Sequence, residues 1–140
     1  MTRDPSRPYG NSRVTRTRRA IAAAVERAGG AFTVEDLLSE LRRSGGPSAV
    51  ATVYRAVAAM EAAGHLARVG AREGAALYAR CADPASHHHH VVCDECGRIA
   101  ATRCPLDLAL PDPEATGGFV VTRHEIALYG LCPECARREG

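Results

Sequence analysis

The sequence predicts an α+β protein, in which an N-terminal helical domain with a short hairpin precedes a small C-terminal α/β domain. Three observations support this prediction: three helix patterns followed by two strand patterns, a change of composition after residue 80, and two Cys-x-x-Cys pairs. A chain of 140 residues has room for one compact domain or for two small ones. No apolar run approaches the ~20 residues that span a bilayer, and no secretory signal opens the chain, so we expect a cytoplasmic protein with no membrane partner.

The basic residues are concentrated at the N-terminus. All 18 are arginine although the net charge is only +2, and residues 1–19 carry six arginines against the single acid Asp4. Residues 1–12, with Pro5, Pro8 and Gly10, predict a flexible basic tail. This positive charge suits a polyanion, although a short solvated tail has the same composition.

Two helices are predicted from their ends and their apolar spacing. The first starts near Thr15 in "RTRRAIAAAVERAGG" and ends at Gly29, a favourable residue after a helix. The second has Thr33 as N-cap and Asp36 three residues later, close to a capping box. Its apolar positions follow helical spacing: Val34, Leu37, Leu38 and Leu41.

A third helix is predicted to start at Ser48 and to end at Gly64. One side of it is apolar: Val50, Val53, Val57 and Met60. The opposite side, with Ser48, Thr52 and Arg55, is polar enough to meet a phosphate backbone. "HLARV" and "AALYAR" then predict two strands around a turn at "GAREG". Three helices and a hairpin describe a winged helix, whose third helix enters a major groove, although small helical bundles share this periodicity.

Four of the six cysteines form two pairs with metal-binding spacing: Cys93, Cys96, Cys132 and Cys135. Cytosolic thiols are kept reduced, which argues against a disulfide framework. Two such pairs complete the tetrahedron that Zn²⁺ prefers, and a closed four-sulfur site holds a fold together without performing chemistry. The alternative is four buried free cysteines. Strands are predicted around the pairs from "HHVVC", "RIAA" and "GFVVTRHEIALYG".

Four consecutive histidines at residues 87–90 precede the first cysteine pair. If the run enters a strand, alternate side chains point to opposite faces, and it serves two metal sites with two imidazoles each. Cys81 with His88 and His90 forms a sulfur-and-imidazole set suited to Zn²⁺ over Fe²⁺ or Mn²⁺. The other set is all nitrogen and is completed by a carboxylate: His87, His89 and His124. A tag or a solvated loop is the alternative interpretation of the run.

The stretches "ATVYRAV", "HHHHVVCDECG" and "HEIALYGLCPEC" resemble the ferric uptake regulator family, most closely its zinc uptake branch. The resemblance runs from about Arg13 to Cys135. It implies a homodimeric, metal-loaded repressor of metal-uptake genes that binds palindromic operators in double-stranded DNA, with no enzymatic activity and no small-molecule substrate. It divides the chain into a winged helix at 13–80, a metal-binding hinge at 81–90 and a dimerisation and structural zinc domain at 91–140.

The resemblance also implies roles for individual residues. Tyr54 touches base edges and Arg55 a phosphate, although packing of Tyr54 against the wing is the alternative. Arg13 and Arg18 grip the backbone or minor groove. The four paired cysteines hold structural Zn²⁺, and Cys81 with its two histidines forms the hinge sensor, again with Zn²⁺ as the expected ion. The remaining histidines of the run, with His124, form a second regulatory site.

Three departures from the family pattern stand out. Ala67 occupies a position where zinc sensors place an acid or histidine, and His65 is the nearest substitute. Leu108 stands where the second site expects a carboxylate, with Asp107 and Cys104 as neighbours. The prolines in "CPLDLALPDPEATGG" forbid the family's long dimerisation helix, so we expect an abbreviated interface or one built from sheet.

Other functions fit the same residues less well. A peroxide sensor, or a sensor of iron, nickel or manganese, belongs to the same family, but the soft sulfur of Cys81 argues against an iron centre. A zinc hydrolase would also use a histidine-rich site with an open position, yet the chain lacks a His-Glu-x-x-His motif or an obvious general base.

Overall fold

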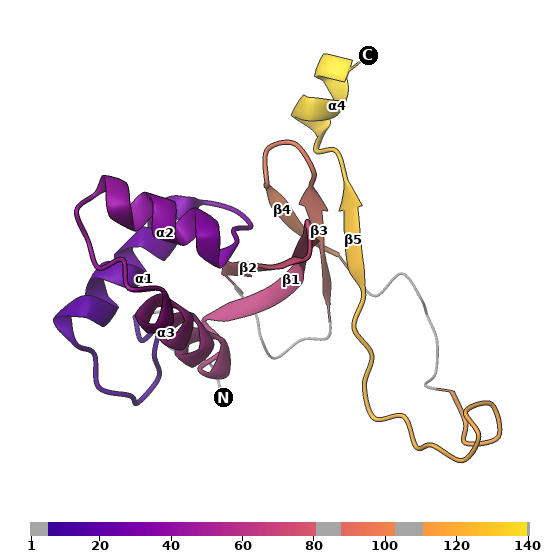
Figure 1. Ribbon diagram of the computed structural model, residues 1–140. Helices are drawn as coiled ribbons and strands as arrows, with labels where there is room; N and C mark the ends of the chain where they lie inside the picture. Colours follow the sequence, from indigo (N-terminus) through magenta and orange to yellow (C-terminus); the bar gives the residue numbers. More distant parts are fainter. Residues whose placement is uncertain (1–5, 81–87, 103–110, 140) are drawn as a thin grey trace.

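The computed structural model describes residues 6–80, 88–102 and 111–139, and its elements fall into two units (Figure 1). The N-terminal unit contains α1 (Arg16–Ala28), α2 (Val34–Arg43), α3 (Val50–Ala62), β1 (Leu66–Arg72) and β2 (Ala75–Arg80). The C-terminal unit contains β3 (His89–Cys93), β4 (Ile99–Thr102), β5 (Ala127–Gly130) and α4 (Pro133–Glu139). Five residues singled out in the sequence lie outside the described part: Cys81, His87, Cys104, Asp107 and Leu108.

The ends of the first two helices are as predicted. The Thr15 hydroxyl accepts a hydrogen bond from the backbone N–H of Arg18, and α1 ends at Gly29 with φ of 68°, in the left-handed region that glycine favours. Thr33 and Asp36 form a reciprocal capping box at the start of α2, which satisfies two backbone N–H groups that a helix start leaves unpaired.

The start of α3 differs from the prediction. The helix begins at Val50 rather than Ser48, and its N-cap is Ala49, which makes no side-chain cap. Val50 is 48% exposed, whereas Val53, Val57 and Met60 are buried as expected. The first turn of α3 therefore lies beyond the edge of the core, so apolar spacing alone placed Val50 wrongly.

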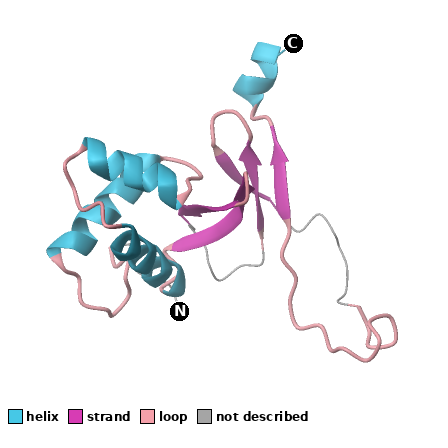
Figure 2. Ribbon diagram, in the orientation of Figure 1, coloured by secondary structure: helices cyan, strands magenta, loops and turns pink. Residues whose placement is uncertain are grey.

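The hairpin is longer and tighter than predicted. β1 continues through residues 70–72, and only Glu73 and Gly74 form the turn. Both have positive φ, 52° and 81°, the geometry of a two-residue turn whose twist matches that of the flanking strands. The order of three helices and a hairpin is the one expected for a winged helix (Figure 2).

The helices enclose a core that also contains Tyr9, which is 2% exposed. The Tyr9 hydroxyl donates a 2.6 Å hydrogen bond to the carbonyl oxygen of Arg18, whose guanidinium carbon lies 5.0 Å from the centre of the tyrosine ring. The flexible tail predicted for residues 1–12 is therefore wrong at least for the segment around Tyr9. Burying the ring removes a large apolar surface from water, and this stabilises the ordered segment.

The C-terminal sheet has the strand order β4-β3-β5, with β3 antiparallel to β4 and parallel to β5. Of the strand predicted over residues 118–130, only Ala127–Gly130 is formed. Phe119 and Val120 are 75% and 77% exposed, in an arm that extends away from the sheet (Figure 1). No described strand pairs with this arm, which explains why apolar alternation there did not produce a strand.

A second buried cluster joins the two units. It combines Val69, Leu77 and Ala79 of the hairpin with Val92 of β3. The hairpin therefore lies between the helices and the C-terminal sheet, as Figure 2 shows. None of the described helices is long and apolar enough to cross a bilayer.

Candidate metal centres and nucleic-acid interface

The parallel pairing of β3 with β5 brings the two cysteine pairs together. Cys93 ends β3 and pairs with Gly130 of β5, two residues before Cys132. Cys96 lies in the turn after β3, and Cys135 is buried in α4. The four Sγ atoms lie within 4.8 Å of one another, and those of Cys96 and Cys132 are 3.7 Å apart. All four are free thiols and not disulfides.

These distances fit a tetrahedral metal ion. With metal–sulfur bonds of about 2.3 Å, adjacent sulfurs of a tetrahedral Zn²⁺ site are about 3.8 Å apart. The Cys132 N–H donates to Cys93 Sγ at 3.3 Å, and the Cys135 N–H donates to Cys132 Sγ at 3.5 Å. Among the described residues, this is the one group of three or more His, Cys, Asp or Glu side chains close enough to hold a metal.

The electrostatics of the cluster also favour a dication. Hydrogen bonds from the backbone N–H groups of Cys96 and Cys132 lower the pKa of Cys93 to about 6. The N–H of Cys135 likewise lowers the pKa of Cys132, whereas the hydrogen bond between their side chains raises the pKa of Cys135 to about 12. Four thiolates this close repel one another, so a cation is needed before all four can be deprotonated.

Four of the five described histidines form two pairs, which strand alternation places on opposite sides of β3. The rings of His88 and His90 have centroids 4.8 Å apart, edge to face. His89, 6% exposed, lies with its ring centroid 5.4 Å from that of His124. Burial, followed by the charge of His88, lowers the pKa of His90, which favours the neutral imidazole that binds metals. The structure thus brings His88 beside His90 and His89 beside His124, but it does not group His65 with the first pair.

His65 lies elsewhere, at the start of the hairpin. Its side chain is 8% exposed, and its Nε2 atom lies 3.9 Å from Oε1 of Glu26. Among the described residues, this atom has no hydrogen-bond partner. Burial, followed by the charge of Arg80, lowers the pKa of His65. Arg80 also donates to Glu26 at 2.7 Å. Sequence reasoning missed Glu26, because no spacing pattern links residues on α1 to the hairpin.

The exposed face of α3 is the candidate nucleic-acid interface. Tyr54 is 56% exposed, Arg55 and Ser48 are exposed, and Thr52 is half-buried. Exposure of Tyr54 favours contact with a ligand over packing against the hairpin. Val50, which sequence reasoning placed in the core, is exposed one helical turn before Tyr54.

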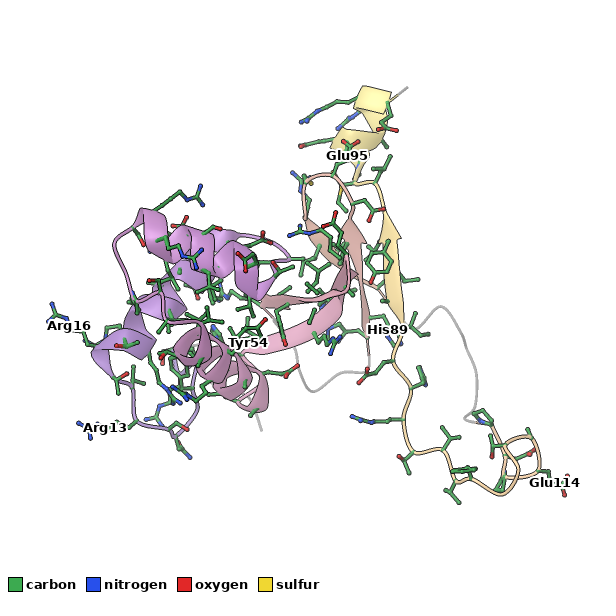
Figure 3. All side chains as sticks on the ribbon, viewed as in Figure 1. Arg13, Arg16, Tyr54, His89, Glu95 and Glu114 are labelled. Atoms are coloured by element: carbon green, nitrogen blue, oxygen red, sulfur yellow. The ribbon has the colours of Figure 1, made fainter. Side chains whose placement is uncertain are left out.

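Further exposed arginines lie at the start of α1. Arg13, Arg16 and Arg19 are all exposed there. Arg18 differs, because its guanidinium lies over the ring of Tyr9. Figure 3 shows Arg13 and Arg16 on the side of the N-terminal unit that faces away from the C-terminal sheet.

Comparison with known proteins shows which family the chain belongs to. The model of the ferric uptake regulator family matches residues 10–129. The chain belongs to the ferric uptake regulator family. Members of this family are dimeric DNA-binding transcriptional regulators that respond to metals, and they are not enzymes. The remote alternative of a zinc hydrolase is thereby excluded.

The relatives are named for the regulation of uptake of different metals. The chain is 35% identical over 105 residues to the ferric uptake regulation protein of Neisseria meningitidis serogroup A, covering 74% of this chain and 72% of that one. It is 32% identical over 124 residues to the zinc uptake regulation protein of Mycobacterium tuberculosis, covering 88% and 94%. In fold it is similar to a zinc uptake regulator solved with zinc and DNA, with a TM-score of 0.68 at 24% identity over 92% of this chain and 87% of that one.

Proposed function

We propose that this regulator senses zinc and, as a zinc-loaded homodimer, represses metal-uptake genes by binding palindromic operators. The observation that carries the proposal is the pairing of the His88 and His90 rings at the entrance of β3. These imidazoles follow Cys81 by seven and nine residues, at the junction between the two units. A thiolate with two imidazoles is a donor set suited to Zn²⁺ over Fe²⁺ or Mn²⁺.

The similarity to the zinc uptake regulation protein of Mycobacterium tuberculosis supports this choice, since it extends over 88% of this chain. His65 is our proposed fourth ligand of the hinge site. Its buried Nε2, which has no hydrogen-bond partner among the residues that the structure describes, is the kind of nitrogen that a metal satisfies. Zn²⁺ is also the ion we propose for the four-cysteine centre, where it would be structural and hold the two cysteine pairs together.

The hinge ion acts by linkage in this proposal. A palindrome is bound only when the two α3 helices of the dimer lie at a fixed separation. An ion held by ligands from the end of the hairpin and the start of β3 favours one arrangement of the two units. If that arrangement is the DNA-binding one, DNA in turn tightens the binding of the ion by the same factor. Because this function requires access to DNA, we also propose that the protein is cytoplasmic.

DNA recognition is divided between two kinds of contact. We assign contacts with DNA bases to Tyr54. Contacts with the DNA phosphate backbone are assigned to arginines and polar residues of the N-terminal unit: Arg13, Arg18, Ser48, Thr52 and Arg55. Arginine contacts to phosphate supply affinity that depends on salt, whereas contacts to base edges supply specificity. The guanidinium of Arg18 lies over the ring of Tyr9, so a phosphate contact of this arginine would lie beside the N-terminal segment.

A second regulatory ion is a further part of the proposal. The neighbouring rings of His89 and His124 support a nitrogen-rich site on the other face of β3. His87 and Asp107 complete its proposed donor set, with Asp107 in place of the carboxylate that the family pattern expects at residue 108.

The alternative within the family is a sensor of iron, nickel or manganese, or of peroxide. Its support is the similarity to the ferric uptake regulation protein of Neisseria meningitidis. One experiment separates these functions: binding of the dimer to its own upstream DNA is followed by fluorescence anisotropy while Zn²⁺, Fe²⁺, Mn²⁺ or Ni²⁺ is added. Zinc sensing requires that Zn²⁺ promote binding at the lowest free concentration of the four ions. Activation by Fe²⁺ or Mn²⁺ alone contradicts zinc sensing, and DNA binding that no ion alters contradicts metal sensing altogether.

A further inference from the structure

The N-terminal unit rests on the C-terminal sheet through a few close contacts, which we call the docking surface. Its members come from the α1–α2 connection, from β1, from the turn after Cys96 and from β5: Gly30, Ala31, Gly70, Ala71, Gly97 and Tyr129. Half of these residues are glycines, at points where two backbones or a backbone and a ring approach closely.

Tyr129 of β5 makes the first of two contacts in the docking surface, with β1. Its hydroxyl oxygen accepts a 2.7 Å hydrogen bond from the backbone N–H of Ala71, and the two residues are 58 positions apart in the sequence. The Ala71 N–H is on the edge of β1 that does not pair with β2. A side chain of the C-terminal unit thus accepts a hydrogen bond from the hairpin of the N-terminal unit.

Gly70 makes this contact sterically possible. A Cβ atom at this position would lie 2.5 Å from the Tyr129 hydroxyl oxygen and 3.0 Å from Cζ of the ring, closer than real Cβ contacts. The register of β1 and β2 is irregular between Arg68 and Gly70. This irregularity turns Val69 into the second buried cluster and presents the glycine to the tyrosine.

The second contact of the docking surface involves Gly97, the residue next to a cysteine of the metal centre. The Ala31 N–H donates a 2.8 Å hydrogen bond to the carbonyl oxygen of Gly97, the residue after Cys96. A Cβ at Gly30 would lie 2.6 Å from the same oxygen, so this approach also requires glycine. The docking surface therefore fastens the N-terminal unit at two places on the C-terminal unit, with Val92 and the hairpin packed nearby.

The docked arrangement leaves the candidate DNA face open. Arg13 and Arg16 point away from the C-terminal sheet, and Tyr54 lies on α3, outside the docking surface (Figure 3). Docking therefore fixes the orientation of α3 without covering it. Fixing the orientation lowers the entropy lost when both recognition helices of a dimer bind one palindrome.

We propose that Tyr129 is a positioning residue, which holds the N-terminal unit on the C-terminal sheet so that the two α3 helices of the dimer match one half-site spacing. This rests on the proposed function. The hydroxyl contact acts independently of the hinge ion, because it joins Tyr129 to the backbone of Ala71 directly.

The test compares Tyr129→Phe, which removes only the hydroxyl, with Gly70→Ala, which displaces the ring. Gly130→Ala is the matched control, because it changes the neighbouring residue and a Cβ there meets nothing within 4 Å. Hydrogen–deuterium exchange at the Ala71 amide is measured without DNA. Affinity is then measured, with the zinc-loaded full-length protein, for its own upstream operator and for the same duplex with two base pairs inserted at its centre.

We expect both variants to speed exchange at Ala71 and to reduce the preference for the native spacing by about 3- to 10-fold, the range for loss of one hydrogen bond. Zinc content should stay at the wild-type value, and Gly130→Ala should behave as wild type. Unchanged exchange in both variants overturns the contact, and faster exchange with an unaltered spacing preference overturns the positioning role. A wild-type protein that binds neither duplex contradicts the proposed function and overturns the positioning role with it, while the exchange data still report on the contact.

Discussion

The Sγ atoms of Cys96 and Cys132 lie 3.7 Å apart, although 36 residues separate them in the sequence. The pairing of β3 with β5 places them there, and α4 carries the fourth sulfur, Cys135. This centre connects the last strand, the last helix and the turn that contacts the N-terminal unit through Gly97.

Loss of this centre should destabilise the C-terminal unit. We expect Cys96→Ser to release the structural zinc and to lower the thermal midpoint by at least about 10 °C, which corresponds to a few kcal/mol for a chain of this size. Zinc content by atomic emission and unfolding by circular dichroism measure the two effects. Retention of wild-type zinc content and thermal midpoint would show that the four sulfurs do not share one ion.

Cys81→Ser should alter operator binding and leave the structural zinc in place, the reverse of the effect expected for Cys96→Ser. Because Cys81 belongs to the proposed hinge site and not to the four-cysteine centre, we expect operator binding to lose its dependence on zinc while one structural zinc per chain remains. A zinc titration of operator affinity and the zinc content of the purified variant are the two measurements. Equal affinities of wild type and Cys81→Ser across the titration would refute the hinge assignment.

Tyr54 and Arg55 should contribute to DNA binding in different ways. Tyr54→Ala is expected to cost about 1–3 kcal/mol on the operator and little on unrelated DNA, because it removes a base contact. Arg55→Ala should weaken binding to both DNAs and reduce the slope of log affinity against log salt by about 1. Arg123→Ala is the control, since Arg123 is exposed on the C-terminal unit, with its side chain 84% accessible. Equal losses of Tyr54→Ala on both DNAs would argue against base readout.

Tyr9 should make the folded state sensitive to alkali. Burial raises the pKa of Tyr9 from 10.0 to about 12, so the unfolded chain releases this proton first and the free energy of unfolding falls as pH rises through that interval. Tyr9→Phe should cost about 1 kcal/mol at neutral pH, from the lost hydrogen bond to Arg18. Urea unfolding at pH 8 and pH 11 should show this deficit shrinking or reversing. Parallel pH profiles of the two proteins would contradict the assignment.

Elements built from neighbouring residues were predictable from the sequence. The capping box of Thr33 and Asp36 spans four residues, and its two hydrogen bonds depend only on those side chains and their own backbone. The alternation that pairs His88 with His90 follows from the period of a strand. The two Cys-x-x-Cys spacings are likewise local features of the sequence, and they predicted the metal centre.

Burial and contacts between distant segments could not be predicted in this way. Nothing near Tyr9 in the sequence distinguishes a tail from a core residue, and nothing near Val50 indicates that its helical turn lies beyond the core. The strand expected over residues 118–126 lacks a described neighbour, because strand pairing depends on a second segment. The contact of Tyr129 with Ala71 joins residues 58 positions apart.

The sequence by itself therefore determined the N-caps of α1 and α2, the order of the helices and the hairpin, and the residue types available to bind metals. These depend on hydrogen bonds and periodicities that span a few residues. Only the tertiary structure decided which side chains are buried, where Arg18 lies and how the hairpin meets the C-terminal sheet. These features depend on the mutual packing of segments that the chain brings together only when it folds, so no local pattern contains them.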